Sequence, residues 1–72
     1  MLDPNHVAAY GNRGALYSIK DEYRKAIADF DRAIELDPNC SFPYFNRGQV
    51  YRTIGDIPRA NADFAKAREL GI

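Results

Sequence analysis

The sequence predicts an all-α fold built from two antiparallel helix–turn–helix units. The first observation behind this prediction is the tetrapeptide Leu-Asp-Pro-Asn, which occupies 2–5 and returns at 36–39. The second is that many residues after the first copy recur after the second at the same spacing. A fixed spacing of this kind indicates one structural unit used twice. The recurring pairs include Tyr10/Tyr44, Asn12/Asn46, Arg13/Arg47, Gly14/Gly48, Tyr17/Tyr51, Ala26/Ala60, Asp29/Asp63, Phe30/Phe64 and Ala33/Ala67.

The third observation is the helical spacing of apolar and small residues within each unit. Tyr10, Gly14 and Tyr17 follow one another at intervals of four and three residues, and Ala26 and Phe30 start a second series of the same kind. Both series lie on one face of a helix. We therefore expect four helices, at 6–19, 22–36, 40–53 and 56–70.

Helix-breaking residues separate these four segments. Each Asp-Pro pair ends one helix and begins the next, because Asp can cap a helix and Pro fits only its first turn. Within the units, Asp21 and Gly55 stand at equivalent turn positions, where a left-handed residue is expected. Pro43 and Pro58 fall in first turns, where proline is accepted.

Small residues mark the expected contact between the helices of a unit. Gly14 and Gly48 stand mid-helix, where glycine is unfavourable by about 1 kcal/mol relative to alanine. Their equivalent positions suggest that no side chain fits there. We expect Ala26 and Ala60 to face these glycines, with the phenylalanine one turn after each alanine filling the space beyond.

The composition and charge of the chain limit the classes of partner that it is expected to bind. Residues 1–72 are expected to form a single domain, with one unit at about 5–38 and the other at about 39–72. Ten acidic residues balance ten basic ones, which argues against nucleic acid or an anionic membrane as a partner. No signal peptide or bilayer-spanning run is evident, so we expect a cytoplasmic location.

No catalytic or cofactor chemistry is predicted. His6 and Cys40 are the single residues of their types, too few for a structural zinc site and without the spacing of a nucleophile–base pair. The glycines are scattered, so no phosphate loop is present. Several carboxylates lie at salt-bridge spacing from basic residues on the same helix, which is typical of a solvated face. These carboxylates are Asp29, Asp31, Glu35 and Asp63. We expect no enzyme, no cofactor and no metal.

The spacing of the recurring residues resembles the tetratricopeptide repeat. In the first unit the resemblance rests on Tyr10-x-x-Arg13-Gly14-x-x-Tyr17 and on Ala26-x-x-x-Phe30 followed by Pro38. The second unit repeats it from Tyr44 to Phe64. The arginines stand where leucine is commonest and the first tyrosines where tryptophan is commonest. The resemblance implies two repeats stacked as a short right-handed superhelix, an α-solenoid.

Two differences between the units indicate which end of the pair would contact a further repeat. Ile27 and Ile34 become Asn61 and Arg68 in the second unit. In this family that helix face packs on the next repeat, so the second unit is expected to end a stack with a polar outer face. Tyr10, Leu16 and Tyr17 are then partly uncovered at the other end. We expect either the C-terminal piece of a longer array or self-association through this end.

The resemblance also implies a function and a site. The first helix of each repeat lines a concave groove, which predicts a non-catalytic module that binds a protein or peptide partner; the alternative is a self-association module forming a homo-oligomer. Asn12 and Asn46 either contact a ligand or brace neighbouring helices, and Phe42 and Phe45 either anchor a ligand or serve as packing. The peptide-binding residues are expected to be Asn12, Phe45, Asn46, Gln49 and Arg52.

Some family members bind acidic chaperone tails through a carboxylate clamp. The clamp uses an asparagine at the position of Asn12 and Asn46 together with basic residues from neighbouring first helices. Ala8 and Gly11 offer no charge here, so we expect no complete clamp.

Overall fold

A computed structural model describes residues 4–71, with side chains from His6 onward. Its four helices are α1 (Pro4–Ile19), α2 (Tyr23–Leu36), α3 (Ser41–Thr53) and α4 (Ile57–Glu69). The all-α prediction is confirmed, and each helix begins and ends within two residues of its expected limits. Residues 2 and 3 of the expected joint at 2–5 lie outside the described residues.

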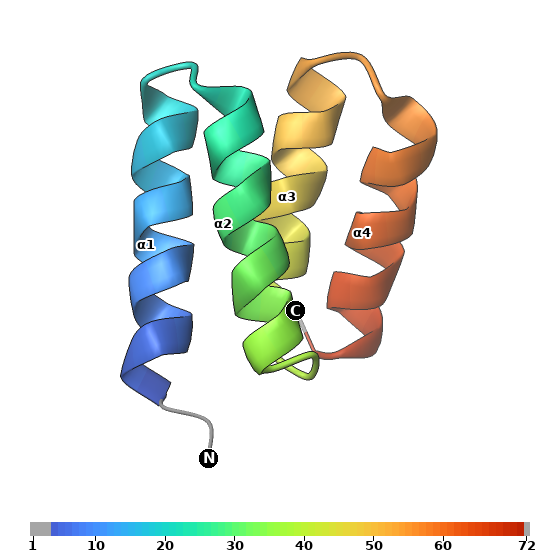
Figure 1. The fold of residues 1–72 in the computed structure, drawn as a ribbon. Helices are drawn as coiled ribbons and strands as arrows, with labels where there is room; N and C mark the ends of the chain where they lie inside the picture. Colours follow the sequence, from blue (N-terminus) through green and yellow to red (C-terminus); the bar gives the residue numbers. More distant parts are fainter. Residues whose placement is uncertain (1–3, 72) are drawn as a thin grey trace.

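Successive helices run antiparallel, with the α1–α2 and α3–α4 turns at one end of the molecule and the α2–α3 turn at the other (Figure 1). Within each unit the two helices pack along their length. The units meet through α2 and α3, and α1 also contacts α3. This arrangement leaves α1 at one end of the molecule and α4 at the other.

The turn residues adopt the predicted backbone conformations. Asp21 has a φ of 62° and Gly55 a φ of 89°, both in the left-handed region. The Tyr23 hydroxyl donates a 2.8 Å hydrogen bond to the Asp21 carboxylate, which fixes the α1–α2 turn. After the second turn, the Asp56 carboxylate accepts the Arg59 N–H at 3.3 Å and caps α4.

The glycine contacts differ from the prediction. A Cβ added at Gly14 would lie 2.7 Å from Cε1 of Phe30, and one at Gly48 would lie 2.9 Å from Cε1 of Phe64. The phenylalanine rings, rather than Ala26 and Ala60, are therefore the groups nearest to the glycines. The physical reason is the size of the aromatic ring, which extends from one helix to the backbone of the other.

The joint between the units contains the hydrophobic cluster of the molecule. Val50 of α3 packs with Ala26 and Phe30 of α2, all three buried, and Ile27 lies against them. Beside this cluster, Nη1 of Arg47 donates a 2.8 Å hydrogen bond to Asp31 of α2. The expected packing of the α2 face that carries Ile27 is confirmed.

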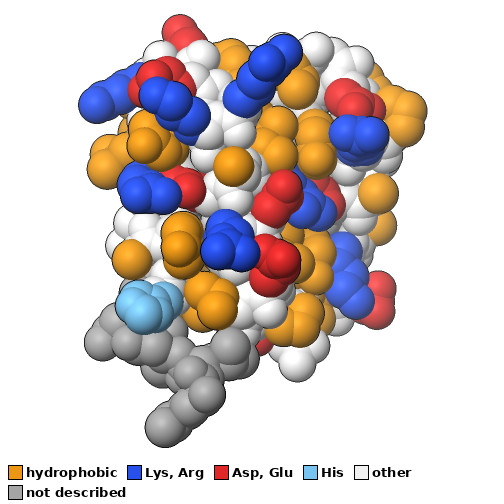
Figure 2. Space-filling model, in the orientation of Figure 1, with side chains coloured by type: hydrophobic (Ala, Val, Ile, Leu, Met, Phe, Trp, Pro, Cys, Tyr) orange, Lys and Arg blue, Asp and Glu red, His pale blue; other side chains and the backbone are white. Residues whose placement is uncertain are grey.

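Charged side chains of both signs are interspersed with hydrophobic ones over the face drawn in Figure 2. This distribution matches the even balance of acids and bases in the sequence. Among the described residues, no helix is long and apolar enough to cross a bilayer.

Candidate functional site

A groove runs between α1 and α3, and it consists of two neighbouring hollows. The larger has a volume of about 530 Å³ and reaches from Ala8 of α1 to Phe42 of α3. The smaller, of about 340 Å³, continues toward Ile19. Ala15 and Asn46 line both hollows, so the two form one continuous depression.

Small residues on α1 keep the groove open. Ala8, Gly11 and Ala15 line the larger hollow, and a Cβ added at Gly11 would meet no atom within 4 Å. Opposite them, Phe42 of α3 is 64% exposed and borders the same hollow. The groove thus offers space on one wall and an aromatic ring on the other.

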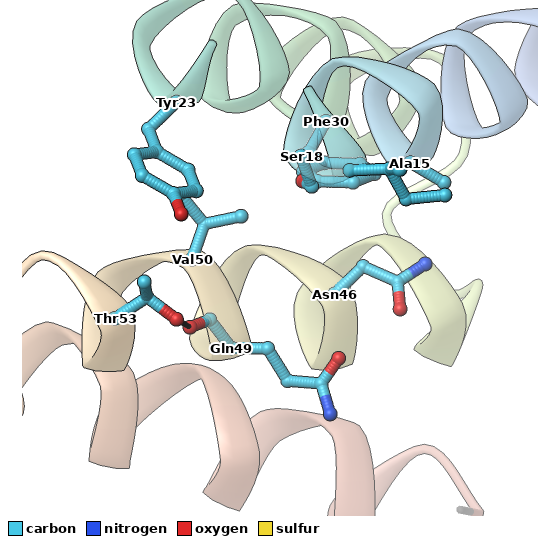
Figure 3. A pocket seen from close by; sticks show the side chains of 9 residues that line it. Ala15, Ser18, Tyr23, Phe30, Asn46, Gln49, Val50 and Thr53 are labelled. Atoms are coloured by element: carbon cyan, nitrogen blue, oxygen red, sulfur yellow. Dashed lines mark hydrogen bonds between the residues drawn. The ribbon is translucent and has the colours of Figure 1, made fainter. Parts of the chain in front are cut away.

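Three amide side chains lie along this groove. Asn12 lines the larger hollow, Gln49 the smaller, and Asn46 both. Figure 3 shows the Asn46 side chain projecting from α3 toward Ala15, whereas the Gln49 side chain extends from α3 away from Ala15 and Ser18. Among the described residues, none of the three amide groups has a hydrogen-bond partner within the chain. They do not brace the neighbouring helices through hydrogen bonds, and their donors and acceptors remain available.

The other two expected site residues lie elsewhere on α3. The Phe45 ring packs on Phe64 of α4 with a centroid separation of 5.6 Å. The Arg52 guanidinium carbon lies 5.7 Å from the centroid of the same ring. Phe45 and Phe64 line a separate hollow of about 370 Å³ with Asn61 and Arg68 at the α4 end of the molecule. The structure therefore brings Asn12, Asn46 and Gln49 together and leaves Phe45 and Arg52 outside the groove.

Residues 7–40 match the family model of the tetratricopeptide repeat. The matched segment covers α2 and all of α1 except its first three residues, and the second pair reproduces these helices and the turn conformation at equivalent positions. Residues 7–40 therefore form a tetratricopeptide repeat, and the four-helix fold is that of a helical repeat solenoid. A search of curated protein sequences finds no match. Tetratricopeptide repeats form helical solenoids and typically serve as non-catalytic protein–protein interaction modules.

Each tetratricopeptide repeat of this chain contains an arginine–aspartate pair that sequence analysis missed. Arg13 donates through Nε and Nη2 to both oxygens of Asp29, at 2.7 and 2.8 Å. Arg47 makes the same two hydrogen bonds to Asp63, at 2.8 and 2.7 Å. The expectation that Asp29 and Asp63 belong to a solvated face is wrong, because both are buried. The available signal was that each aspartate recurs together with its arginine at an unchanged separation.

Two tyrosines flank the guanidinium in each repeat. The Arg13 guanidinium carbon lies 5.7 Å from the Tyr10 ring centroid and 5.8 Å from that of Tyr17. Arg47 has the equivalent tyrosines at the same two distances. Hydrogen bonding to Asp63 raises the pKa of Arg47 above its usual value. The rings and the carboxylate together hold each guanidinium in a fixed orientation.

Proposed function

We propose that this tetratricopeptide repeat chain binds an extended peptide segment of a partner protein in the groove between α1 and α3. The observation that carries the proposal is the row of three amides without internal hydrogen bonds beside a wall of small residues. Such a row is suited to a peptide backbone, because each amide supplies both donors and an acceptor. Exposed Phe42 supplies an apolar contact for one side chain of the peptide.

Filling the groove tests the proposal. Peptides selected by display against the chain are titrated calorimetrically into the wild type, Gly11→Leu and Asn46→Ala. Gly11→Leu introduces a side chain into open space within the larger hollow, so it should block binding without disturbing the helix. We expect at least a tenfold loss of affinity, equivalent to about 1.4 kcal/mol.

Ile54→Glu is the control for this titration. Ile54 is exposed at the end of α3 and lines neither hollow of the groove. Its substitution should leave peptide affinity unchanged. Selected peptides that bind Gly11→Leu and Asn46→Ala as tightly as the wild type would place their binding site outside the groove.

Self-association through the α1 end is the second candidate function. Leu16, in the last turn of α1, is an exposed large hydrophobic residue, and its burial against a second copy of the chain would be favourable. For a homo-oligomer, molar mass should rise with concentration in light scattering and Leu16→Glu should abolish the rise. A constant mass of 8.2 kDa would remove this candidate.

A further inference from the structure

We propose that the outer face of α1, formed by Ala9, Arg13 and Leu16, docks an amphipathic helix of another protein. That helix carries an aspartate or glutamate with one aliphatic residue four positions before it and another three positions after it. This surface is separate from the groove, so the proposal goes beyond peptide binding between α1 and α3. It rests on the way α2 of the first repeat covers the equivalent face of α3.

The equivalent face of α3 is occupied within the molecule. Pro43, Arg47 and Val50 are the counterparts of the three α1 residues in the second repeat. Pro43 is buried, Val50 is 3% exposed, and the side chain of Arg47 is 20% exposed. The covering element is α2, which packs against α3 through the cluster that contains Val50. The contact between α2 and α3 is therefore a model, within this chain, for a helix docked on the outer face of α1.

On α1 the same positions are open. Leu16 is 58% exposed, as is the side chain of Arg13, and Ala9 is exposed as well. Ala9, Tyr10 and Arg13 line a hollow of about 190 Å³. An aliphatic side chain, a small residue and a guanidinium are therefore presented together without a covering helix.

The hydrogen bonds of the two arginines specify a carboxylate. Arg47 uses Nε and Nη2 for Asp63 of its own repeat and Nη1 for Asp31 of the neighbouring α2. Arg13 uses Nε and Nη2 for Asp29, and its Nη1 has no hydrogen-bond partner among the described residues. Because matching pairs of tyrosines orient both guanidiniums, Nη1 of Arg13 is positioned for a carboxylate as Nη1 of Arg47 is.

The α2 surface that covers α3 defines the pattern of the partner helix. Asp31 supplies the carboxylate and Ile27, four residues earlier, packs against the hydrophobic cluster. Ile34 lies three residues after Asp31 on the same side of the helix. A partner helix with this pattern would place its carboxylate at Nη1 of Arg13 and an aliphatic residue near Leu16.

A second copy of this chain does not offer that pattern. The positions of α4 equivalent to the α2 pattern are Asn61, Ala65 and Arg68, all of them exposed. They provide neither a carboxylate nor a large aliphatic residue, and Arg68 adds a positive charge. Charge and shape therefore favour a helix from a different protein over head-to-tail stacking of identical chains.

Transferring the pattern to α4 tests the docking surface within the full chain. The triple variant N61I/A65D/R68I gives α4 the outward residues of α2, at positions exposed in the wild type. We expect its molar mass in light scattering to rise with concentration, while wild-type mass stays constant. Adding Leu16→Glu should abolish the rise, whereas adding Ile54→Glu, a substitution at another exposed isoleucine, should preserve it.

Omitting the carboxylate isolates the role of Arg13. The double variant N61I/R68I should associate at least tenfold more weakly than the triple variant. Circular dichroism establishes that each variant is folded. A folded triple variant that stays monomeric, or associates regardless of Leu16→Glu, would overturn the proposal, as would equal association of the double and triple variants.

A labelled peptide copying residues 22–36 serves as the probe in trans. Fluorescence anisotropy should show binding to the wild type that weakens at least tenfold when the peptide carries Asp31→Lys or the chain carries Leu16→Glu. The peptide could also bind by replacing α2 of the chain itself. Weaker binding to the Leu16→Glu variant distinguishes docking on α1 from this replacement, because Leu16 lies on the proposed docking face of α1. Absence of binding to the wild type, or wild-type mass rising as steeply as that of the triple variant, contradicts the proposal.

Discussion

Arg47 connects three helices through one side chain. Its guanidinium, on α3, bonds to Asp63 of α4 and to Asp31 of α2. Asp63 is buried, so its carboxylate depends on this arginine for its charge-assisted hydrogen bonds. One guanidinium therefore makes both a contact within a repeat and a contact between repeats.

Replacing Arg47 with methionine should destabilise the protein by about 1–3 kcal/mol, because a buried carboxylate loses its donors. Urea unfolding followed by circular dichroism measures the change. Arg59→Met is the matched control, since Arg59 is paired with Asp56 at 3.4 Å and lies 5.7 Å from the Tyr51 ring centroid, but has no buried carboxylate as partner. Its effect should stay within about 1 kcal/mol. An equal decrease in the free energy of unfolding for the two variants would mean that the hydrogen bonds to buried Asp63 stabilise the protein no more than an exposed pair does.

Substituting alanine at two helical glycines should give effects of opposite sign. At Gly48 the new methyl would meet the Phe64 ring at 2.9 Å and Cβ of Asp63 at 3.2 Å, so we expect a loss of about 1–3 kcal/mol. At Gly11 it would meet nothing, and the better helix propensity should stabilise the protein by up to about 1 kcal/mol. Thermal and urea unfolding measure both changes. A Gly48→Ala variant at least as stable as the wild type would show that packing against Phe64 does not require glycine.

At the scale of the element, the helix limits could be predicted because single residues determine them. Proline, the Asp21 and Gly55 turns and the Asp56 cap each act through local backbone geometry. The orientation of each helix about its axis was harder to predict. It decides that Phe45 faces Phe64, and that Asn46, one residue later, faces the groove. Helical spacing groups residues by face, but only packing determines which neighbour each face meets.

The α1–α2 turn should have a measurable pH dependence. The hydrogen bond from Tyr23 to Asp21 raises the pKa of Tyr23, because ionising the phenol removes the donor and adds a like charge. The folded-state pKa is thus above the unfolded value of about 10, so the bond stabilises the turn below that pH. This stabilisation is lost as the pH rises through the folded-state pKa.

Asp21→Asn tests this dependence, since asparagine also tolerates a left-handed backbone. Ultraviolet titration should show the Tyr23 phenol ionising at a lower pH in the variant than in the wild type. Tyr51→Phe in both backgrounds removes the signal of one tyrosine that is distant from the turn. An unchanged titration would mean that the Asp21 carboxylate does not interact with the phenol in solution.

For the whole molecule, the repeat period predicted the number and order of the helices. The arginine–aspartate pairs were not predicted, because they join residues on different helices and helical spacing reports only contacts within one helix. The location of the groove followed from the family resemblance. Only the structure shows that the amides line this groove and that Phe45 lies outside it, in a separate hollow.

The two repeats should depend on each other for folding. Val50 of the second repeat completes the cluster around Phe30 of the first, so residues 1–38 alone would expose that cluster. We expect a peptide of residues 1–38 to lose most of its helical circular dichroism signal, since stacked repeats usually need about three units. Adding residues 39–72 in trans should restore part of the signal. A peptide that retains full helicity would show that the first repeat folds independently.

The polar residues on α4 bear on stoichiometry. Asn61 and Arg68 give the far end of the chain a surface unlike the one that α2 turns toward α3. α4 therefore lacks the residues with which to dock on α1 of a further copy, and growth stops after one helix has bound to α1. The complex should be self-limiting, with a valence of one at that surface however concentrated the components become.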